Sequence, residues 1–194
     1  WVEKYRTNTI QVFILLKDNK KTFQDFLNRG EIPNILLAGP PGIGKTTVAK
    51  ALCNELGCDY LVINGSDEGR FLDTVRNSAK NFASCVSLQG SRRHKVIIIY
   101  EADHTTNDVQ LKNKIIEPLH SRCSVVEFAV KGKDKANLAS EFYKRIQSIL
   151  ETENVDFEPK VLIELVKKHF PDWRRVLNEC QRYSVGGKID SGVL

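Results

Sequence analysis

The feature that most constrains the fold of this chain is a glycine-rich segment at residues 39–46, with the sequence Gly-Pro-Pro-Gly-Ile-Gly-Lys-Thr. It fits the pattern G-x-x-x-x-G-K-[ST]. Residues 35–38 before it are wholly apolar, which predicts a buried strand, and residues 45–56 after it carry apolar side chains on one helical face. In a strand–loop–helix of this kind, the backbone N–H groups of the loop and of the helix N-terminus point at a phosphate group.

Two side chains at the end of this segment fit a nucleoside triphosphate. Lys45 would bring positive charge to the β- and γ-phosphates, and the Thr46 hydroxyl would be a ligand of Mg²⁺. The plainer alternative is an ordinary glycine-rich turn between a strand and a helix. The residues that we expect to surround the phosphates are Gly39, Pro40, Pro41, Gly42, Ile43, Gly44, Lys45 and Thr46.

Short apolar runs alternate with helical patterns in the first two thirds of the chain. Strands are expected at residues 60–63, 95–100 and 124–128, and a helix at residues 70–84. Strands that alternate with helices predict a doubly wound α/β domain around a parallel sheet. We place this domain at residues 1–130.

The pattern changes after residue 130. Three helical segments are expected at residues 134–150, 158–170 and 173–183, with no strand among them. Asp172 stands where a helix N-cap is expected, directly before the third segment. These residues predict a second, small helical domain at residues 131–194.

Composition excludes several classes of protein. The 194 residues carry a net charge of +5, which permits binding to nucleic acid without requiring it. The five cysteines include no C-x-x-C pair, so we expect reduced thiols in a cytoplasmic protein rather than a disulfide or zinc framework. No apolar run approaches the roughly 20 residues of a membrane span, and the first residues do not resemble a signal peptide.

An ATPase with a phosphate-binding loop also needs an acidic group at the end of a neighbouring buried strand. The run at residues 95–100 leads directly into Glu101, which could orient and polarise the attacking water. The residue just before it, where an aspartate for Mg²⁺ is expected, is Tyr100, and a tyrosine cannot replace a carboxylate as a metal ligand at neutral pH. Glu101 could alternatively be a plain surface acid at a strand end.

Five short motifs in a fixed order identify a resemblance. They are Glu3-Lys4-Tyr5-Arg6, the glycine-rich loop, Asn64-Gly65-Ser66-Asp67, Glu101-Ala102-Asp103, and Pro118-Leu119-His120-Ser121-Arg122-Cys123. Together they resemble the AAA+ sliding-clamp-loader ATPases of the replication factor C small-subunit type. Residues 165–175 and 190–194 are most similar to the large subunits of T4-type bacteriophage clamp loaders. The resemblance covers nearly the whole chain and implies a P-loop AAA+ domain followed by a helical lid.

The resemblance also implies roles for individual residues around ATP and Mg²⁺. Tyr5 and Arg6 would lie against the adenine and ribose, and Thr47 would join Lys45 and Thr46 at the phosphates and Mg²⁺. Glu101 would be the catalytic acid. Arg122 would be an arginine finger that reaches the ATP site of a neighbouring subunit, and Arg174 would contact the γ-phosphate of its own site. An ordinary surface charge is the alternative for each arginine.

The implied partners are a sliding clamp, primer–template DNA and the other subunits of a ring or spiral, with no membrane. In such an assembly DNA is held through its phosphates, so binding is independent of sequence and sensitive to salt. The candidate DNA-binding residues are Arg70, Arg76, Lys80, Arg92 and Arg93. A solvated charged face is the alternative for this set. If the source is a bacteriophage, the implied location is the host cytoplasm.

The chain also departs from the family pattern. Tyr100 replaces the usual aspartate, and Thr7 stands where the family has proline. About one helix and one strand are missing between Leu111 and Lys112, because residues 112–118 are too few for a parallel crossover. We expect that strand to fill the sheet between residues 95–100 and 124–128. The family usually has a third, collar domain as well, which we expect to be absent from residues 1–194.

These departures keep two rival functions open. One is a clamp-loader subunit that binds nucleotide without hydrolysing it, which the tyrosine at position 100 favours. The other is a different AAA+ machine on DNA, such as a branch-migration helicase.

Overall fold

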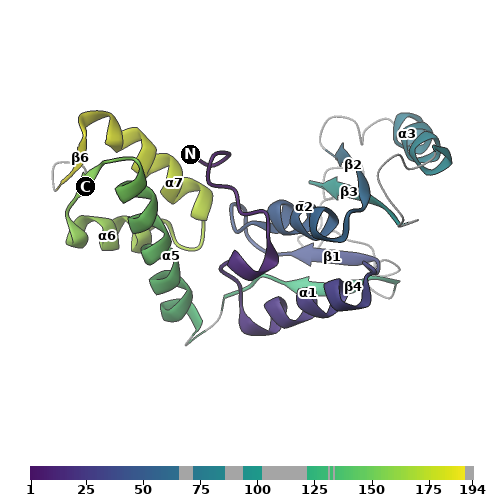
Figure 1. Cartoon of the computed structure of the whole chain (residues 1–194), viewed down its shortest axis with the longest axis horizontal. Coiled ribbons are helices and arrows are strands. Elements are labelled where there is room, and N and C mark those ends of the chain that lie inside the picture. The colour runs from purple at the N-terminus through teal and green to yellow at the C-terminus, as the bar shows by residue number, and fades with distance from the viewer. Residues whose placement is uncertain (66–71, 86–93, 102–121, 131, 133, 191–194) are drawn as a thin grey trace, which may run out of the picture.

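The computed structural model of the chain describes residues 1–65, 72–85, 94–101, 122–130, 132 and 134–190 (Figure 1). Its first part, up to residue 130, is a mixed α/β unit, and its second part is a bundle of helices. Helix α2 (Lys45–Leu56) matches the sequence prediction. It follows α1 (Lys17–Arg29), and each of the two helices ends at a glycine in the left-handed conformation. A short 3-10 helix, η1 (Ile10–Val12), precedes them.

The four strands of the α/β unit form two parallel pairs. Strand β1 (Ile35–Ala38) pairs with β4 (Ser124–Glu127), and β2 (Asp59–Asn64) pairs with β3 (Lys95–Tyr100). No hydrogen bonding joins one pair to the other within the described residues. The elements predicted from sequence are therefore present, but as two ribbons rather than one continuous sheet.

The position of the gap in the sheet differs from the sequence prediction. We expected the missing strand between residues 95–100 and 124–128, but β4 is hydrogen-bonded to β1 in register from Ile35–Ser124 to Ala38–Glu127. Strand β1 is drawn between β4 and the β2–β3 pair (Figure 1). The gap therefore faces β1 and β3. Residues 102–121, where the shortened segment falls, lie outside the described part of the chain.

Helix α2 packs against both strand pairs. Val48, Ala51 and Leu52 are buried in the cluster that also holds β1 and β4. Cys53 and Leu56, on an adjacent face, are buried with Ile98 of β3. The helix that follows the glycine-rich loop thus contributes buried residues to both halves of the sheet, and Leu27 of α1 and Ile32 also pack against both clusters.

Strand β3 is buried on one face only. Ile98 faces α2 and is 8% exposed, whereas Ile97 and Ile99 are 40% and 47% exposed. The sequence prediction of a fully buried strand is therefore wrong for the outer face. Helix α3 (Leu72–Ser84) contacts β2 and is anchored by Lys95, whose Nζ donates to the carbonyl oxygen of Phe82 at 2.6 Å.

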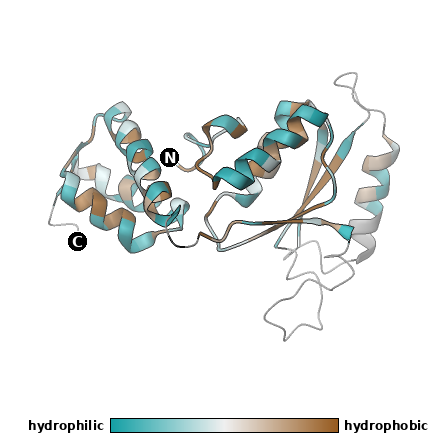
Figure 2. Ribbon diagram, turned by 90° about the horizontal axis from the view of Figure 1, so that it is seen from below, coloured by the Kyte–Doolittle hydropathy of each residue, from teal (hydrophilic) through white to brown (hydrophobic). Residues whose placement is uncertain are grey.

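The second part contains α5 (Asp134–Thr152), α6 (Pro159–His169) and α7 (Trp173–Tyr183), at the three predicted places. Their buried apolar residues form one cluster. Figure 2 shows hydrophobic and hydrophilic stretches alternating along these helices. The prediction that this part has no strand is wrong. Two-residue strands β5 (Asp156–Phe157) and β6 (Lys188–Ile189) pair in parallel, because the chain after α7 and a second 3-10 helix, η4 (Ser184–Gly186), returns beside the loop that follows α5.

The N-terminal segment before α1 packs against both parts. Ile10, Phe13 and Leu15 belong to the core of the α/β unit, while Trp1 and Ile14 pack on the core of the helical part. Among the described helices, none is long and apolar enough to cross a membrane.

Candidate functional site

A cleft lies where the glycine-rich loop, the N-terminal segment and the helical part meet. It encloses about 830 Å³ of empty space, counting the space that is continuous with solvent. From the sequence-predicted site it takes Tyr5, Arg6, Gly42, Ile43, Gly44, Thr47 and Arg174. Residues from three distant stretches of the sequence are therefore brought to one cleft, as the nucleotide-site prediction requires.

The glycine-rich loop is folded around its own lysine. The Lys45 Nζ donates to the carbonyl oxygens of Gly39 and Pro40, each at 2.8 Å. Gly42 and Gly44 have φ values of +71° and +99°, a left-handed conformation that favours glycine. This conformation allows the successive N–H groups of the loop to curve around an anion. Lys45, Thr46 and the first residues of the loop do not line the cleft in this conformation.

The helical part rests directly on this loop. A Cβ atom added to Gly42 would lie 1.8 Å from the Asp172 Oδ1 atom. The same Oδ1 accepts a hydrogen bond from the Arg175 backbone N–H at 3.0 Å, which caps α7 as the sequence predicts. The start of α7, which carries Arg174, is thereby held over the loop.

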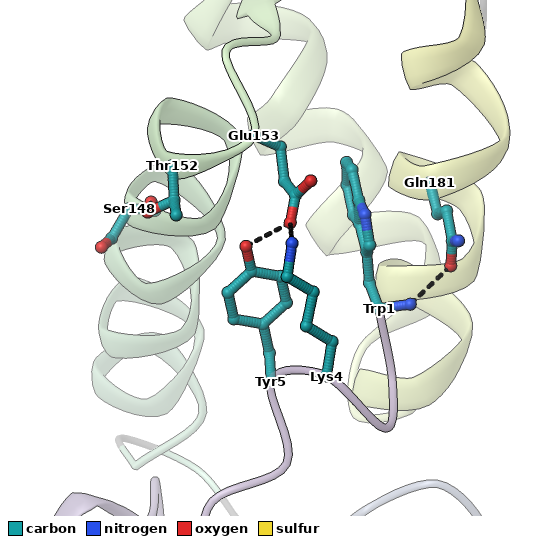
Figure 3. Close-up of polar contacts among 7 residues, drawn as sticks. All are labelled: Trp1, Lys4, Tyr5, Ser148, Thr152, Glu153 and Gln181. Atoms are coloured by element: carbon teal, nitrogen blue, oxygen red, sulfur yellow. Dashed lines mark hydrogen bonds and ion pairs between the residues drawn. The ribbon is translucent and has the colours of Figure 1, made fainter.

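Three contacts tie the N-terminal segment to the helical part (Figure 3). The Trp1 amino group donates to the Gln181 side chain at 2.7 Å. The Lys4 Nζ forms an ion pair with Glu153 at 2.6 Å, and the Tyr5 hydroxyl donates to the same carboxylate. These hydrogen bonds lower the pKa of the Glu153 carboxyl and raise the pKa values of Lys4 and Tyr5. The N-terminal segment, which lines the cleft, is thus bound to the helical part through Trp1, Lys4 and Tyr5.

Two hydrogen-bond donors that border the cleft have no partner. The Arg6 Nε and the Trp173 Nε1 are buried and make no hydrogen bond, and both residues line the cleft. A buried donor without a partner is uncommon, because it has lost its hydrogen bonds to water without replacement. Both donors suit a ligand rich in acceptor atoms, so the cleft fits a nucleotide.

The predicted catalytic acid lies at the end of β3. Glu101 is exposed and has a φ of +54°, which is rare for a residue other than glycine. Tyr100, the last residue of β3, accepts a hydrogen bond from the Gly65 N–H at 2.9 Å through its carbonyl oxygen. No group of three or more histidine, cysteine or acidic side chains that could hold a metal occurs in the described residues. Thr46, the Mg²⁺ ligand predicted from the sequence, is the second residue of α2.

Arg122 lies at the other end of the sheet from the glycine-rich loop. It is exposed and lies two residues before the start of β4, where Ser124 donates its N–H to the carbonyl oxygen of Asn34 at 2.8 Å. The loop follows Ala38, at the opposite end of β1. Because β1 and β4 are parallel and in register, Arg122 is separated from the loop of its own chain by the length of a strand.

The predicted DNA-binding residues are only partly described. Lys80 is exposed on α3, and Arg76 belongs to the same helix. Arg70, Arg92 and Arg93 lie outside the described residues, as does Asp103.

Sequence reasoning missed the apolar and cationic lining that the helical part contributes. Phe142, Arg145 and Ile149 of α5, with Trp173 and Leu177 of α7, line the cleft beside Arg174. Their spacing in sequence is that of an ordinary core face, so no pattern separates them from residues that only pack. Arg145 is the exception, since a cation next to two apolar core positions, Phe142 and Ile146, is a detectable signal.

Two family models match the chain. The model for the lid domain of the AAA+ ATPase described as the sliding-clamp-loader large subunit matches residues 134–194. The model for the ATPase family associated with various cellular activities matches residues 35–153.

Several curated proteins are similar along nearly the whole chain. The sliding-clamp-loader large subunits of Enterobacteria phage T4 and Escherichia phage RB69 are 37% and 36% identical, over 99% of this chain and 67% of theirs. The replication factor C small subunit of Sulfolobus acidocaldarius is 33% identical over 97% of this chain and 64% of its own. The phage T4 alignment has 220 positions, so at least 26 of them have no residue among the 194 of this chain.

Among solved structures, the fold is similar to the Holliday-junction branch-migration motor RuvB of Thermotoga maritima. The TM-score is 0.69 over 97% of this chain and 70% of that one, with 20% identical residues. At this identity the similarity supports the fold alone. It confirms the predicted arrangement of an AAA+ domain followed by a helical lid.

Proposed function

The chain belongs to the clamp-loader family of AAA+ ATPases, and from this membership we propose that it is an ATPase subunit of a DNA-polymerase sliding-clamp loader. In this role ATP binding assembles a spiral of subunits that opens a sliding clamp and holds primer–template DNA. Hydrolysis then releases the closed clamp on the DNA. The observation that carries the proposal is the cleft, in which the glycine-rich loop, the Tyr5–Arg6 segment and Arg174 of the lid meet.

Each part of the cleft suits one part of ATP. The glycine-rich loop and the start of α2 offer backbone N–H groups to the phosphates. When Lys45 contacts the phosphates, it gives up its hydrogen bonds to the carbonyl oxygens of Gly39 and Pro40. Tyr5 and the apolar residues Ile149 and Leu177 form a surface for the base. Arg174, at the start of α7, supplies charge from the lid side. The Thr46 hydroxyl would hold Mg²⁺, which neutralises charge on the phosphates when bound.

The position of Arg122 supports a role in trans. It lies a strand length away from its own loop, so its guanidinium is available to the ATP site of an adjacent subunit and not to its own. An arginine supplied across an interface stabilises the charge of the transition state and makes hydrolysis depend on assembly. We therefore expect Arg122→Ala to abolish hydrolysis in the assembled complex while ATP binding by the isolated subunit is unchanged.

The proposal is tested first by ATP binding, measured by calorimetry on the wild-type chain and on Lys45→Ala. We expect Lys45→Ala to lose at least about tenfold in affinity, because it removes the charge that contacts the phosphates. Lys50→Ala, on the same helix but outside the cleft, is the matched control and should bind as the wild type does. Wild-type protein that binds no ATP contradicts the proposal.

The second test uses the complete complex with its companion subunits, clamp and primer–template DNA. We expect phosphate release that depends on DNA and clamp, and that falls strongly in Glu101→Gln. Loss of DNA binding as salt is raised would support the phosphate contacts proposed for Lys80, Arg76 and the other basic residues. Strand unwinding without clamp binding would instead favour a helicase.

A second candidate function is a subunit that binds ATP without hydrolysing it. The specific observation in its favour is Tyr100, which stands at the end of β3 where an acidic metal ligand is expected. Saturable ATP binding together with no release of phosphate by this subunit in the assembled complex would establish it. Recovery of hydrolysis in Tyr100→Asp would identify the tyrosine as the cause.

A further inference from the structure

Trp173 is placed unlike any other aromatic residue that the structure describes. It is the first residue of α7, directly before Arg174. It packs against the core cluster of the α/β unit and also against that of the helical part, and no other described residue belongs to the surroundings of both. The indole therefore lies at the junction between the lid and the domain that carries the glycine-rich loop.

The indole ring is held by two other aromatic rings of the lid. Phe142 of α5 lies with its ring centroid 4.2 Å away, tilted by 32°, and Phe170 meets the ring edge-on at 4.9 Å. Contacts of this geometry fix the orientation of a ring. The direction of the indole N–H is consequently set by the lid rather than free to rotate away.

That N–H group has nothing to donate to. The Trp173 Nε1 is buried and lacks a hydrogen-bond partner, although a buried tryptophan usually finds one. The residue lines the candidate nucleotide cleft, and the other buried donor without a partner, the Arg6 Nε, lines the same cleft from the N-terminal segment. Two such donors from different parts of the chain at one cleft indicate a missing acceptor.

We propose that Trp173 is a nucleotide-binding residue, whose indole N–H donates a hydrogen bond to an acceptor atom of the bound nucleotide. The inference rests on the proposed function, because it takes ATP as the ligand of the cleft. A nucleotide offers many acceptor atoms on its phosphates, ribose and base, and no acceptor of the protein occupies this role in the described residues. The hydrogen bond forms only when the lid lies over the loop, since the indole moves with α7.

This arrangement gives the nucleotide a direct contact with the residue that joins the two cores. A bound nucleotide satisfies the donor of Trp173 and so stabilises the lid in the closed position. Loss of the nucleotide leaves a buried donor without a partner, which costs free energy and favours lid opening.

The test compares ATP affinity, by calorimetry in the presence of Mg²⁺, for the wild-type chain, Trp173→Phe and Trp1→Phe. Phenylalanine keeps the ring contacts with Phe142 and Phe170 but removes the N–H. We expect Trp173→Phe to bind ATP roughly two- to tenfold more weakly, the effect of one hydrogen bond. Trp1→Phe, the matched control outside the cleft, should retain wild-type affinity.

A second measurement keeps the tryptophan in place. The chain has two tryptophans, so Trp1→Phe leaves Trp173 as the only indole fluorophore. Its emission should shift when ATP is added, and the shift should be absent when Lys45→Ala is combined with Trp1→Phe.

The outcomes separate the inference from the proposed function. If the wild type binds ATP and Lys45→Ala does not, yet Trp173→Phe binds as tightly as the wild type, the role of Trp173 is wrong and the proposed function stands. ATP binding that leaves the emission of Trp173 unchanged has the same meaning. If the wild type binds no ATP, the proposed function fails and the inference fails with it.

Discussion

The two parts of this molecule reach stability in different ways. In the lid, α5, α6 and α7 enclose one continuous core that includes Leu162, Val176 and Cys180, each fully buried. In the α/β unit the core is divided into two clusters, one around β1 and β4 and one around β3. Helix α2 is the element with buried residues in both. The lid is thus a closed unit, while the two ribbons of the α/β unit are connected mainly by α2, with Leu27 and Ile32 also packing against both clusters.

This difference indicates where the molecule is most easily deformed. A parallel sheet usually carries hydrogen bonds across all of its strands, so that the strands and the covering helices form one body. Here the β2–β3 pair is attached through the face of α2 that bears Cys53 and Leu56. We expect it to separate from the rest of the molecule before the lid core does.

The largest expected effect comes from two matched core substitutions. Leu52 of α2 and Leu162 of α6 are 1% and 0% exposed, and replacing a buried leucine with alanine lowers the free energy of unfolding by about 2–5 kcal/mol. We expect Leu162→Ala to fall near the upper end, because its surroundings are closed and cannot collapse into the cavity. Leu52→Ala should fall near the lower end, since the split sheet beside it can relax.

Urea unfolding of both variants measures this difference in the free energy of unfolding. Leu16 is half-buried, so Leu16→Ala gives the reference for a partly buried leucine, with a smaller loss of stability. If Leu52→Ala lowers the free energy of unfolding by as much as Leu162→Ala or more, the core of the α/β unit is as rigid as the core of the lid.

Thiol labelling gives an effect of intermediate size. Burial raises the pKa of Cys53 and of Cys180 to about 12, so neither forms the reactive thiolate at pH 8, whereas Cys85 is exposed. We expect Cys85 to react at once, Cys53 next through local opening around α2, and Cys180 last. Mass spectrometry of the labelled peptides over time measures the order. Labelling of Cys180 before Cys53 would show that the lid opens more easily than the α/β unit, which contradicts this prediction.

The smallest expected effect concerns the contact of Lys4 and Tyr5 with Glu153. The hydrogen bonds from Lys4 and Tyr5 lower the pKa of Glu153 in the folded protein. The ionised carboxylate therefore stabilises the fold fully at pH values above the pKa of a glutamate in the unfolded chain, about 4.3. This stabilisation is lost as the pH falls through the lower pKa that Glu153 has in the folded protein. Glu153→Gln should therefore lower the melting temperature slightly at pH 7 and leave it unchanged at strongly acidic pH.

Glu151→Gln is the control for that experiment, because Glu151 lies at the end of α5, two residues before Glu153, and accepts a hydrogen bond from Gln147 instead of from the N-terminal segment. An equal change in both variants at pH 7 would assign no stability to the contact itself.

Much of the fold follows from local patterns in the sequence. The spacing of apolar residues predicts α2 and α7 with their observed bounds. The short β5–β6 pair was not predictable, because two residues carry no periodic pattern and their pairing depends on how the chain returns after α7. The pairing of β4 with β1 is likewise a property of topology, which local spacing does not encode.

In the candidate site, too, residues in contiguous sequence motifs were predicted, and residues that only the fold brings to the cleft were not. The loop and its lysine are a contiguous motif, and the remaining predicted residues, Tyr5, Arg6 and Arg174, came from the family resemblance. Trp173 and Phe142 escaped prediction because an aromatic residue on an apolar helix face looks the same whether it packs in a core or borders a ligand. Only the arrangement in space, with a buried N–H beside the cleft, separates the two.

The contact between Gly42 and the lid has a consequence for how the chain can change by mutation. Any other residue at position 42 would have to adopt a φ of +71° and place its Cβ against the Asp172 carboxylate. A change at position 172 would relieve the second demand but not the first, so a substitution at position 42 stays strained even when Asp172 is replaced. In a library of random variants that is selected for nucleotide binding, glycine should therefore be retained at position 42, whereas position 172 should accept other residues that can cap α7.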